Sequence, residues 1–389
     1  MTLAIDLCAG IGWSVACERL GISELGIEIM DEAVATRTSM GMLTQQVSIA
    51  DLPDTYCAQA PIQIAGPPCQ TFSAAGNGEG RRMLDEVLRR VSVFATTGTL
   101  IKGGEGDPRT WLVLEPLRLA VGGMPMYIVW EQVPSVLPVW ESCARVLDTA
   151  GYSTWTGILH SEQYGVPQTR KRAFLMARRD GIPAGPPVPT HSKYHHRTPE
   201  QLDSGVLPWV SMATALGWGV TGRPSFTITG GGSSTGGADP YGRAARESLM
   251  DELLAYRNGS HEKAAVRDEV YPAPTVMFGA RSNDVRWVQR SNYTGRGVRS
   301  VPSPVPGSPP LGAREMSEPS ATVTGKGHHW AIAPTASSIR VTVEEAAILQ
   351  TFPRPDLIQG SQGKRYLQVG NMVPPLLGEA ILSMFLEPK

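Results

Sequence analysis

The first twenty residues constrain the fold of this chain more than any other stretch. Leu3–Leu7 is a short apolar run that predicts a strand, Ala9–Gly12 is a glycine turn, and Trp13–Leu20 has the apolar spacing of a helix. A strand, a glycine turn and a helix in this order open the α/β folds that bind ligands at the carboxyl ends of parallel strands. The Gly-x-Gly pair alone is weak evidence, because many turns contain one.

Acidic side chains follow the next two predicted strands. Glu28 lies near the end of the run Leu25–Ile29, roughly 20 residues after the glycines, where a carboxylate suits a ribose diol. Asp51 follows Val47–Ile49, a third plausible strand end. The glycine backbone, Glu28 and Asp51 would together hold an adenosine ligand. The alternative is that both acids are ordinary helix caps.

The stretch Gly66-Pro67-Pro68-Cys69-Gln70 comes directly after the apolar run 61–65. Its two prolines fix φ and exclude a helix, so one cysteine is held in a rigid turn at the end of a predicted strand. The small residues that follow in 71–80 are typical of a mobile loop over an active site. The alternative is a turn with an incidental cysteine.

Two polar clusters lie further along the chain. Glu131 follows the β-rich run Met126–Trp130 and ends a strand with a carboxylate. Between two predicted strands, a period of two places Gln168, Arg170 and Arg172 on one face. A solvated basic turn is the alternative for this second cluster.

Composition narrows the class of protein. The net charge of −1 over 389 residues means that any basic surface must be local. The cysteines number five, an odd count, and form no Cys-x-x-Cys pair, which argues against a disulfide framework or a structural zinc site. No run approaches the ~20 apolar residues of a membrane helix. We therefore expect a cytoplasmic protein without a metal or a membrane partner, and we interpret His191, His195 and His196 as surface residues.

The regular ends of the chain predict one domain, residues 1–185 plus 338–389, interrupted by a smaller, mostly β and irregular domain at 186–337. The interrupting segment is rich in Gly, Ser, Thr, Pro and Arg, and a short Pro/Thr pattern recurs at Pro224, Pro272 and Pro319. Within it, Arg281–Arg299 holds five arginines and one aspartate together with aromatic residues. That stretch is the best candidate for a nucleic-acid contact, and an exposed flexible loop is the alternative.

The order of these motifs resembles the DNA (cytosine-5) methyltransferase family. The matching segments, in order, are Asp6–Gly12, Gly66–Gln70, Glu131–Val133, Gln168–Arg172 and Gly370–Pro374. The resemblance implies a Rossmann-like α/β fold that uses S-adenosyl-L-methionine, with a target-recognition domain in the variable segment. It further implies double-stranded DNA as substrate and a monomer that acts separately from any cognate restriction endonuclease.

The resemblance also implies a role for each matching residue. Cys69 resembles the nucleophile that attacks C6 of cytosine, Glu131 the carboxylate that contacts the base, and Arg170 and Arg172 the pair that orients both. The residues that resemble the cofactor site are Asp6, Leu7, Cys8, Gly10, Gly12, Glu28, Ile29, Asp51, Leu52, Pro67 and Asn371. Candidate contacts to DNA are Gln70, Ser73, Gln168, Arg281, Arg286 and Arg290.

Three features depart from the family pattern. Cys8 stands where the family usually has an aromatic residue, and Gln132 stands where its Glu-Asn-Val has asparagine. The loop between Gln70 and Asp107 is longer than usual. None of these changes removes a group that the chemistry requires.

Other functions remain open at the level of sequence. A nicotinamide-dependent oxidoreductase would use the Gly10 turn but has no use for Gly66–Gln70. A catalytically silent DNA-binding protein would not need Cys69 and Glu131 together. RNA as substrate is a variant of the methyltransferase hypothesis. A donor other than S-adenosylmethionine also stays open.

Overall fold

A computed structural model describes most of the chain. The described residues are 2–68, 71–72, 79–195, 197–198, 200–216 and 342–386, together with the backbone of five short strands between 253 and 340. Several predicted site residues lie outside this set, namely Cys69, Gln70, Ser73, Arg281 and Arg290. The Pro/Thr repeat also falls outside it, apart from the two-residue strand β11 (Ala273–Pro274).

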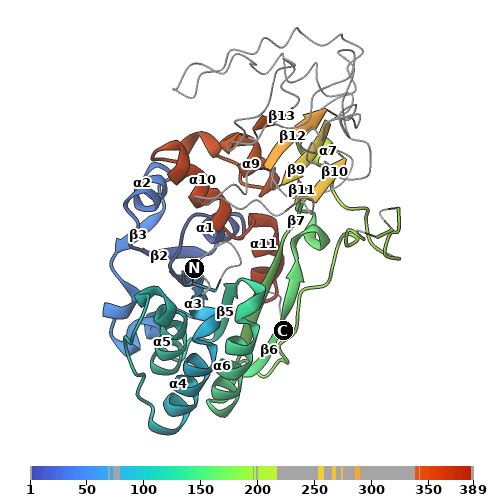
Figure 1. Ribbon diagram of the computed structural model, residues 1–389. Coiled ribbons are helices and arrows are strands. Elements are labelled where there is room, and N and C mark those ends of the chain that lie inside the picture. Colours follow the sequence, from blue (N-terminus) through green and yellow to red (C-terminus); the bar gives the residue numbers. More distant parts are fainter. Residues whose placement is uncertain are drawn as a thin grey trace, which may run out of the picture.

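A seven-stranded sheet in the order β3-β2-β1-β4-β5-β8-β6 organises the described chain (Figure 1). The strands from β3 to β5 run parallel, whereas β8 is antiparallel to both β5 and β6. The carboxyl ends of the parallel strands therefore meet along one edge, and the order of strands turns at β1, which is the usual place for a ligand. The strand bounds are β1 (Leu3–Leu7), β2 (Ser23–Glu28), β3 (Leu43–Gln46), β4 (Ile62–Ala65), β5 (Tyr127–Gln132), β6 (Ser153–His160) and β8 (Lys171–Arg178).

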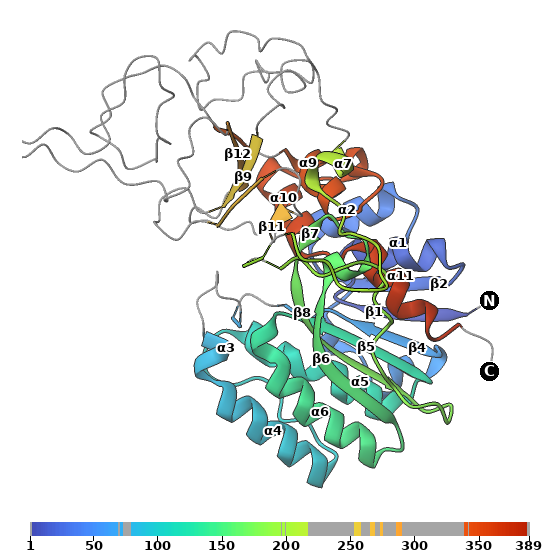
Figure 2. The same ribbon diagram turned by 90° about the vertical axis from the view of Figure 1, so that its right-hand side faces the viewer.

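Helices cover both faces of this sheet, as Figure 2 shows. Alternate side chains of β1 enter two different cores, since Ile5 and Leu7 pack with α4, α5 and α6, while Ala4 packs with α1 and α11. A third core joins α1 to α9 and α10. The helix bounds are α1 (Gly12–Arg19), α2 (Asp31–Ser39), α3 (Glu79–Arg82), α4 (Leu84–Thr97), α5 (Glu115–Gly123), α6 (Leu137–Thr149), α7 (Met212–Leu216), α9 (Val343–Leu349), α10 (Gln362–Asn371) and α11 (Pro375–Ser383).

A smaller sheet combines three strands of the interrupting segment with β13, which follows that segment. Its four strands pair in the order β10-β9-β12-β13, and β11 pairs in parallel with β7 (Gln168–Thr169) of the main domain. Arg286 lies on β12, opposite Arg340 of β13. The bounds of the four strands are β9 (Leu253–Arg257), β10 (Ala265–Asp268), β12 (Val285–Gln289) and β13 (Ser338–Arg340).

The structure differs from the sequence-based expectation in two elements near the ligand edge. The third strand is Leu43–Gln46 rather than 47–49, and Ile49–Asp51 forms a short 3-10 helix. The matching segment Gly370–Pro374 is likewise divided, because Gly370 and Asn371 end α10 and the turn begins at Met372. The expected strand–turn–helix opening is confirmed.

The long segment after the predicted catalytic loop contacts the main domain at two places. The Gly80 amide donates to the Thr71 carbonyl at 3.0 Å, and Phe72 is fully buried beneath Gly80. Further along, the Arg90 guanidinium lies 3.7 Å from the ring centre of Trp111. Residues 79–97 thus form α3 and α4, which pack on the main domain. No helix in the described ranges is long and apolar enough to span a membrane.

Candidate active site

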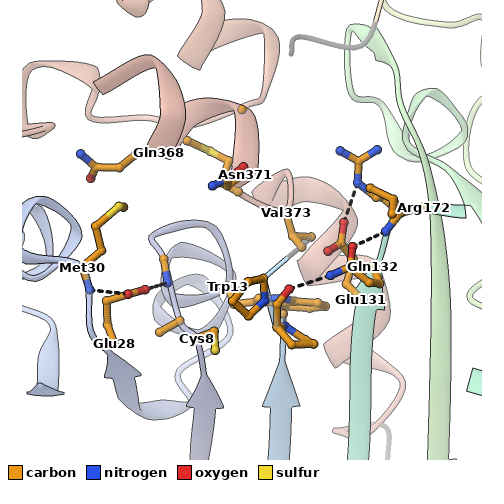
Figure 3. A pocket seen from close by; sticks show the side chains of 18 of the residues that line it. Cys8, Trp13, Glu28, Met30, Glu131, Gln132, Arg172, Gln368, Asn371 and Val373 are labelled. Carbon is orange, nitrogen blue, oxygen red and sulfur yellow. Dashed lines mark hydrogen bonds and ion pairs between the residues drawn. The ribbon is translucent and has the colours of Figure 1, made fainter. Parts of the chain in front are cut away.

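A cavity of about 250 Å³ lies at the carboxyl edge of the sheet (Figure 3). It runs from the end of β2, past the turn between β1 and α1, to the ends of β5 and β8 and the turn after α10. Nine predicted site residues line it: Cys8, Gly10, Glu28, Ile29, Pro67, Glu131, Arg170, Arg172 and Asn371. Other lining residues belong to the matching motifs, among them Gln132 and Val373, whereas the sequence did not single out Trp13 and Met30 for this site.

Glu28 is fixed at one end of the cavity by three backbone amides. Its Oε2 accepts from the Gly10 amide at 3.0 Å, and its Oε1 accepts from the amides of Ile29 and Met30 at 2.8 and 2.9 Å. Hydrogen bonds from three amides hold a carboxylate in one orientation. Glu28 therefore connects the end of β2 to the glycine turn and presents a fixed acceptor to the cavity.

The two glycines of the turn are required for different reasons. Gly10 has a φ of +53°, a conformation that costs little only for glycine. Gly12 touches the closing turn, since a Cβ there would lie 2.1 Å from the Val373 carbonyl oxygen. The backbone of α1 and the turn after α10 thus approach each other closely at the cavity wall.

Arg37 supports the glycine turn through a hydrogen bond to its backbone. The sequence analysis did not predict this role. The side chain is fully buried, and its Nη2 donates to both oxygens of Glu24 at 2.9 Å. Its Nη1 donates to the Gly10 carbonyl at 3.0 Å and to Ser14 Oγ at 2.6 Å. Because Glu28 binds the Gly10 amide and Arg37 its carbonyl, the peptide groups on either side of Gly10 are held. A Cβ on Gly26 would lie 2.1 Å from Arg37 Nη2, so the glycine in β2 makes room for this guanidinium.

Asp6 and Cys8 lie just before the glycine turn, and burial raises the pKa of both side chains. Burial, with help from the nearby Glu24 carboxylate, raises the pKa of Asp6 well above its usual range, and both of its carboxylate oxygens lack a hydrogen-bond partner. Burial likewise raises the pKa of the Cys8 thiol. Cys8 lines the cavity, whereas Asp6 is fully buried behind it.

Asp51 and Leu52 lie on a loop that a second buried arginine holds. Arg118 donates to the carbonyls of Leu52 and Ile49 at 2.9 and 3.1 Å and pairs with Glu115 at 2.7 Å. Asp51 is exposed and Leu52 is buried, and neither belongs to the described lining of the cavity. Leu7 and Gly12 are also buried next to the cavity rather than in its wall.

The other end of the cavity gathers one carboxylate and two arginines. Arg172 Nε lies 2.9 Å from Glu131 Oε1, and Arg170 Nη2 lies 3.9 Å from the same oxygen. Arg170 is 1% exposed and donates to the Gly370 carbonyl at 2.9 Å, so it also ties this end to the closing turn. Gln168, two residues before Arg170, is fully buried. The arginines set the position of the Glu131 carboxylate and balance its charge.

Gln132 connects the end of β5 to the turn that leads to Cys69. Its Nε2 donates to the Pro67 carbonyl at 2.6 Å, and its Oε1 accepts from the Val133 amide at 2.6 Å. The side chain is almost completely buried. The longer amide at this position, a departure from the family pattern, thus still supports the turn.

The described residues of the cavity fit an adenosyl-methionine ligand. No group of three or more His, Cys, Asp and Glu within the described ranges lies close enough to hold a metal ion. The cavity instead offers a glycine turn, a fixed carboxylate at Glu28 and the uncapped amino end of α1. An indole N–H of Trp13, buried without a partner, adds a further donor for an acidic group.

The fold and the cavity define a class of protein. A parallel sheet with β8 inserted antiparallel, and a cavity over the glycine turn after β1, are the features of a Rossmann-like S-adenosylmethionine-dependent methyltransferase. A family model described as C-5 cytosine-specific DNA methylase matches residues 3–387. The chain therefore belongs to this family, and it is an enzyme that methylates cytosine at C5 in DNA.

Curated relatives and solved structures agree with this assignment. The chain is 24% identical over 401 residues to the type II methyltransferase M1.HphI of Haemophilus parahaemolyticus, covering 98% of this chain and 86% of the relative. It is also 24% identical to M.SacI of Streptomyces achromogenes, covering 84% and 71%. The fold is similar to that of S. pombe Dnmt2, with a TM-score of 0.53, 16% identity and coverage of 100% and 99%. EhMeth of Entamoeba histolytica has a TM-score of 0.52, 14% identity and coverage of 100% and 99%.

Proposed function

We propose that this enzyme transfers the methyl group of S-adenosyl-L-methionine to C5 of a cytosine that is flipped out of duplex DNA, through a covalent bond between Cys69 and C6. The observation that carries the proposal is the continuity of the cavity. Glu28 and Glu131 line one space. A donor held at the Glu28 end and a base held at the Glu131 end would therefore meet without a wall between them.

Cys69 supplies the nucleophile in this proposal. Its thiolate would form a bond to C6, and the electron pair of the C5–C6 double bond would form the new bond from C5 to the methyl group. S-adenosylmethionine would supply that methyl group by breaking its sulfonium–methyl bond, and its sulfur would leave as a neutral thioether. A base next removes the C5 proton, the C5–C6 double bond re-forms and the bond from sulfur to C6 breaks. Gln132 assists by holding the Pro67 carbonyl, two residues before the nucleophile.

Glu131, Arg170 and Arg172 hold the base. A carboxyl group at Glu131 can bind N3 and the amino group of cytosine, the two atoms on the edge that the flipped base exposes. The attack on C6 increases negative charge on the ring, and the 2.9 Å ion pair with Arg172 fixes the group that stabilises it. Arg170 keeps this cluster next to the closing turn through Gly370.

DNA recognition is assigned to the segment 186–337 and to residues near the loop. Arg281, Arg286 and Arg290 are proposed to read bases in the major groove, with Gln70, Ser73 and Gln168 near the flipped cytosine. A base in a stacked duplex is out of reach of any such site, so flipping is required and costs a few kcal/mol. We further propose that the enzyme acts as a monomer, independently of any restriction endonuclease.

The test uses tritiated S-adenosylmethionine and mixed-sequence duplex DNA, followed by bisulfite sequencing of the product. We expect label at 5-methylcytosine within one short sequence motif, and no transfer by Cys69→Ser. DNA that contains 5-fluorocytosine should trap the wild-type enzyme covalently, because fluorine cannot leave as a proton does. Methylation by Cys69→Ser at the wild-type rate, or label on another base, would contradict the mechanism.

A further inference from the structure

The side chain of Trp13 has a polar atom that the fold leaves without a partner. Trp13 is 2% exposed, and its Nε1 is buried with no hydrogen-bond acceptor. A buried donor without an acceptor costs roughly 1–3 kcal/mol, so a ligand that supplies the acceptor recovers part of this cost. Since Trp13 also lines the cavity, a ligand can supply the missing acceptor.

The position of Trp13 selects which part of the ligand it meets. It lies in the first turn of α1, next to Gly12, and Figure 3 shows it between Cys8 and the side of the cavity formed by Gln132 and Val373. Glu28, the group suited to ribose, lies on the far side of Cys8 in the same view. The methionine part of the cofactor therefore falls beside the indole, while the adenosine part lies toward Glu28.

The local charge favours an anion at this point. The N-cap of α1 is Ile11, which gives no side-chain cap, so the first amides of the helix are open to a ligand. The amino end of a helix also carries partial positive charge. The packing of the ring holds the indole in place, because a Cβ on Gly378 of α11 would lie 3.2 Å from Trp13 Cε3.

We propose that the Trp13 indole N–H donates a hydrogen bond to the carboxylate of the methionine part of the cofactor, and that Trp13 thereby selects donors that carry this carboxylate. The inference rests on the proposed use of S-adenosylmethionine. The carboxylate is the strongest acceptor in that part of the ligand. A hydrogen bond to a charged group satisfies the buried donor and adds affinity.

The test compares two ligands and two variants by titration calorimetry. Trp13→Phe removes the N–H and keeps an aromatic ring, and we expect it to bind S-adenosylmethionine roughly tenfold to a hundredfold more weakly than the wild type. The decarboxylated analogue of the cofactor should bind both proteins equally. Trp140→Phe is the matched control. The Trp140 Nε1 is also buried without a partner, but Trp140 lies on α6 in the hydrophobic core and does not line the cavity.

The outcomes separate this inference from the proposed donor. If the wild type binds no S-adenosylmethionine, the donor assignment fails and the inference with it. If the wild type binds but Trp13→Phe binds equally well, or loses both ligands to the same extent, only the inference is wrong. An NMR measurement on the wild type does not depend on whether a variant folds. One ¹⁵N-indole resonance should shift when S-adenosylmethionine is added and should not move when the decarboxylated analogue is added. If no indole resonance shifts when S-adenosylmethionine is added, the proposal is wrong.

Discussion

Gln132 shows how one substituted amide can preserve the geometry of a catalytic turn. Its two hydrogen bonds, to Pro67 and Val133, are both 2.6 Å long and buried. Replacing it with the apolar Gln132→Met leaves a buried carbonyl and a buried amide unpaired, at a cost of about 1–3 kcal/mol for each group. We expect kcat to fall at least roughly tenfold, because the turn before Cys69 loosens. Cofactor affinity should change little, and an unchanged kcat in steady-state methylation assays would contradict this role.

Asp6 predicts a pH dependence of stability whose sign follows from its environment. Burial holds the pKa of Asp6 in the folded protein well above its usual range. In the unfolded chain it titrates near pH 4. Above that pH the unfolded chain releases a proton that the folded protein retains, so Asp6 makes the protein less stable as the pH rises. Asp6→Asn cannot ionise, and its stability relative to wild type should increase from pH 4.5 to pH 7.5 in urea unfolding. A difference that does not change with pH would refute the assignment.

At the scale of elements, Arg37 joins β2, α2 and the turn after β1. Arg37→Met leaves the Glu24 carboxylate buried without its partner, which typically costs about 3–5 kcal/mol. It also releases the Gly10 carbonyl, so we expect weaker cofactor binding as well as a lower free energy of unfolding. The double variant Arg37→Met/Glu24→Met should recover part of the stability, because it removes the unpaired charge.

The matched control for Arg37 is an exposed ion pair on α4. Arg89 pairs with Glu86 at 2.7 Å, but its side chain is 56% exposed. Arg89→Met should lower the free energy of unfolding by less than about 1 kcal/mol. Equal losses for Arg37→Met and Arg89→Met in urea titrations would show that the buried network has no special role.

Sequence predicted those elements whose signals are local. The strand–turn–helix opening follows from apolar spacing, and the structure confirms it. The third strand was misplaced because Leu43–Gln46 is polar and largely exposed at the sheet edge, while the apolar 47–49 follows it. The role of Arg37 carries no local signal, since Glu24 and Gly10 are 13 and 27 residues away. Motif resemblance named the proposed catalytic residues, but not the side chains that hold the backbone around them.

At the scale of the whole molecule, the contacts refine where the recognition segment can be exchanged. Residues 186–216 are tied to the main domain, because Tyr164 Oη donates to the Pro187 carbonyl at 3.0 Å and the Thr190 amide donates to the Gln163 carbonyl at 3.0 Å. Ser192, further along, is fully buried. At the other end, Ser338–Arg340 pairs with β12 in the small sheet. We therefore propose 217–341 as the unit for exchange, because the predicted segment 186–337 includes the contacts at Pro187 and Thr190 and ends before β13.

A chimera that replaces 217–341 with the corresponding segment of a relative should keep wild-type cofactor affinity and methylate the relative's sequence. The reason is that the cavity is built from residues outside that segment. Exchange of 186–337 should instead lower the melting temperature, since it cuts the contacts at Gln163 and Tyr164 and divides the small sheet before β13. Calorimetry, thermal unfolding and bisulfite sequencing measure the three quantities. If the 217–341 chimera keeps its original sequence preference, specificity must come from the main domain, and the loop near Cys69 becomes the place to look. If both chimeras are equally stable, the contacts of 186–216 do not define the boundary.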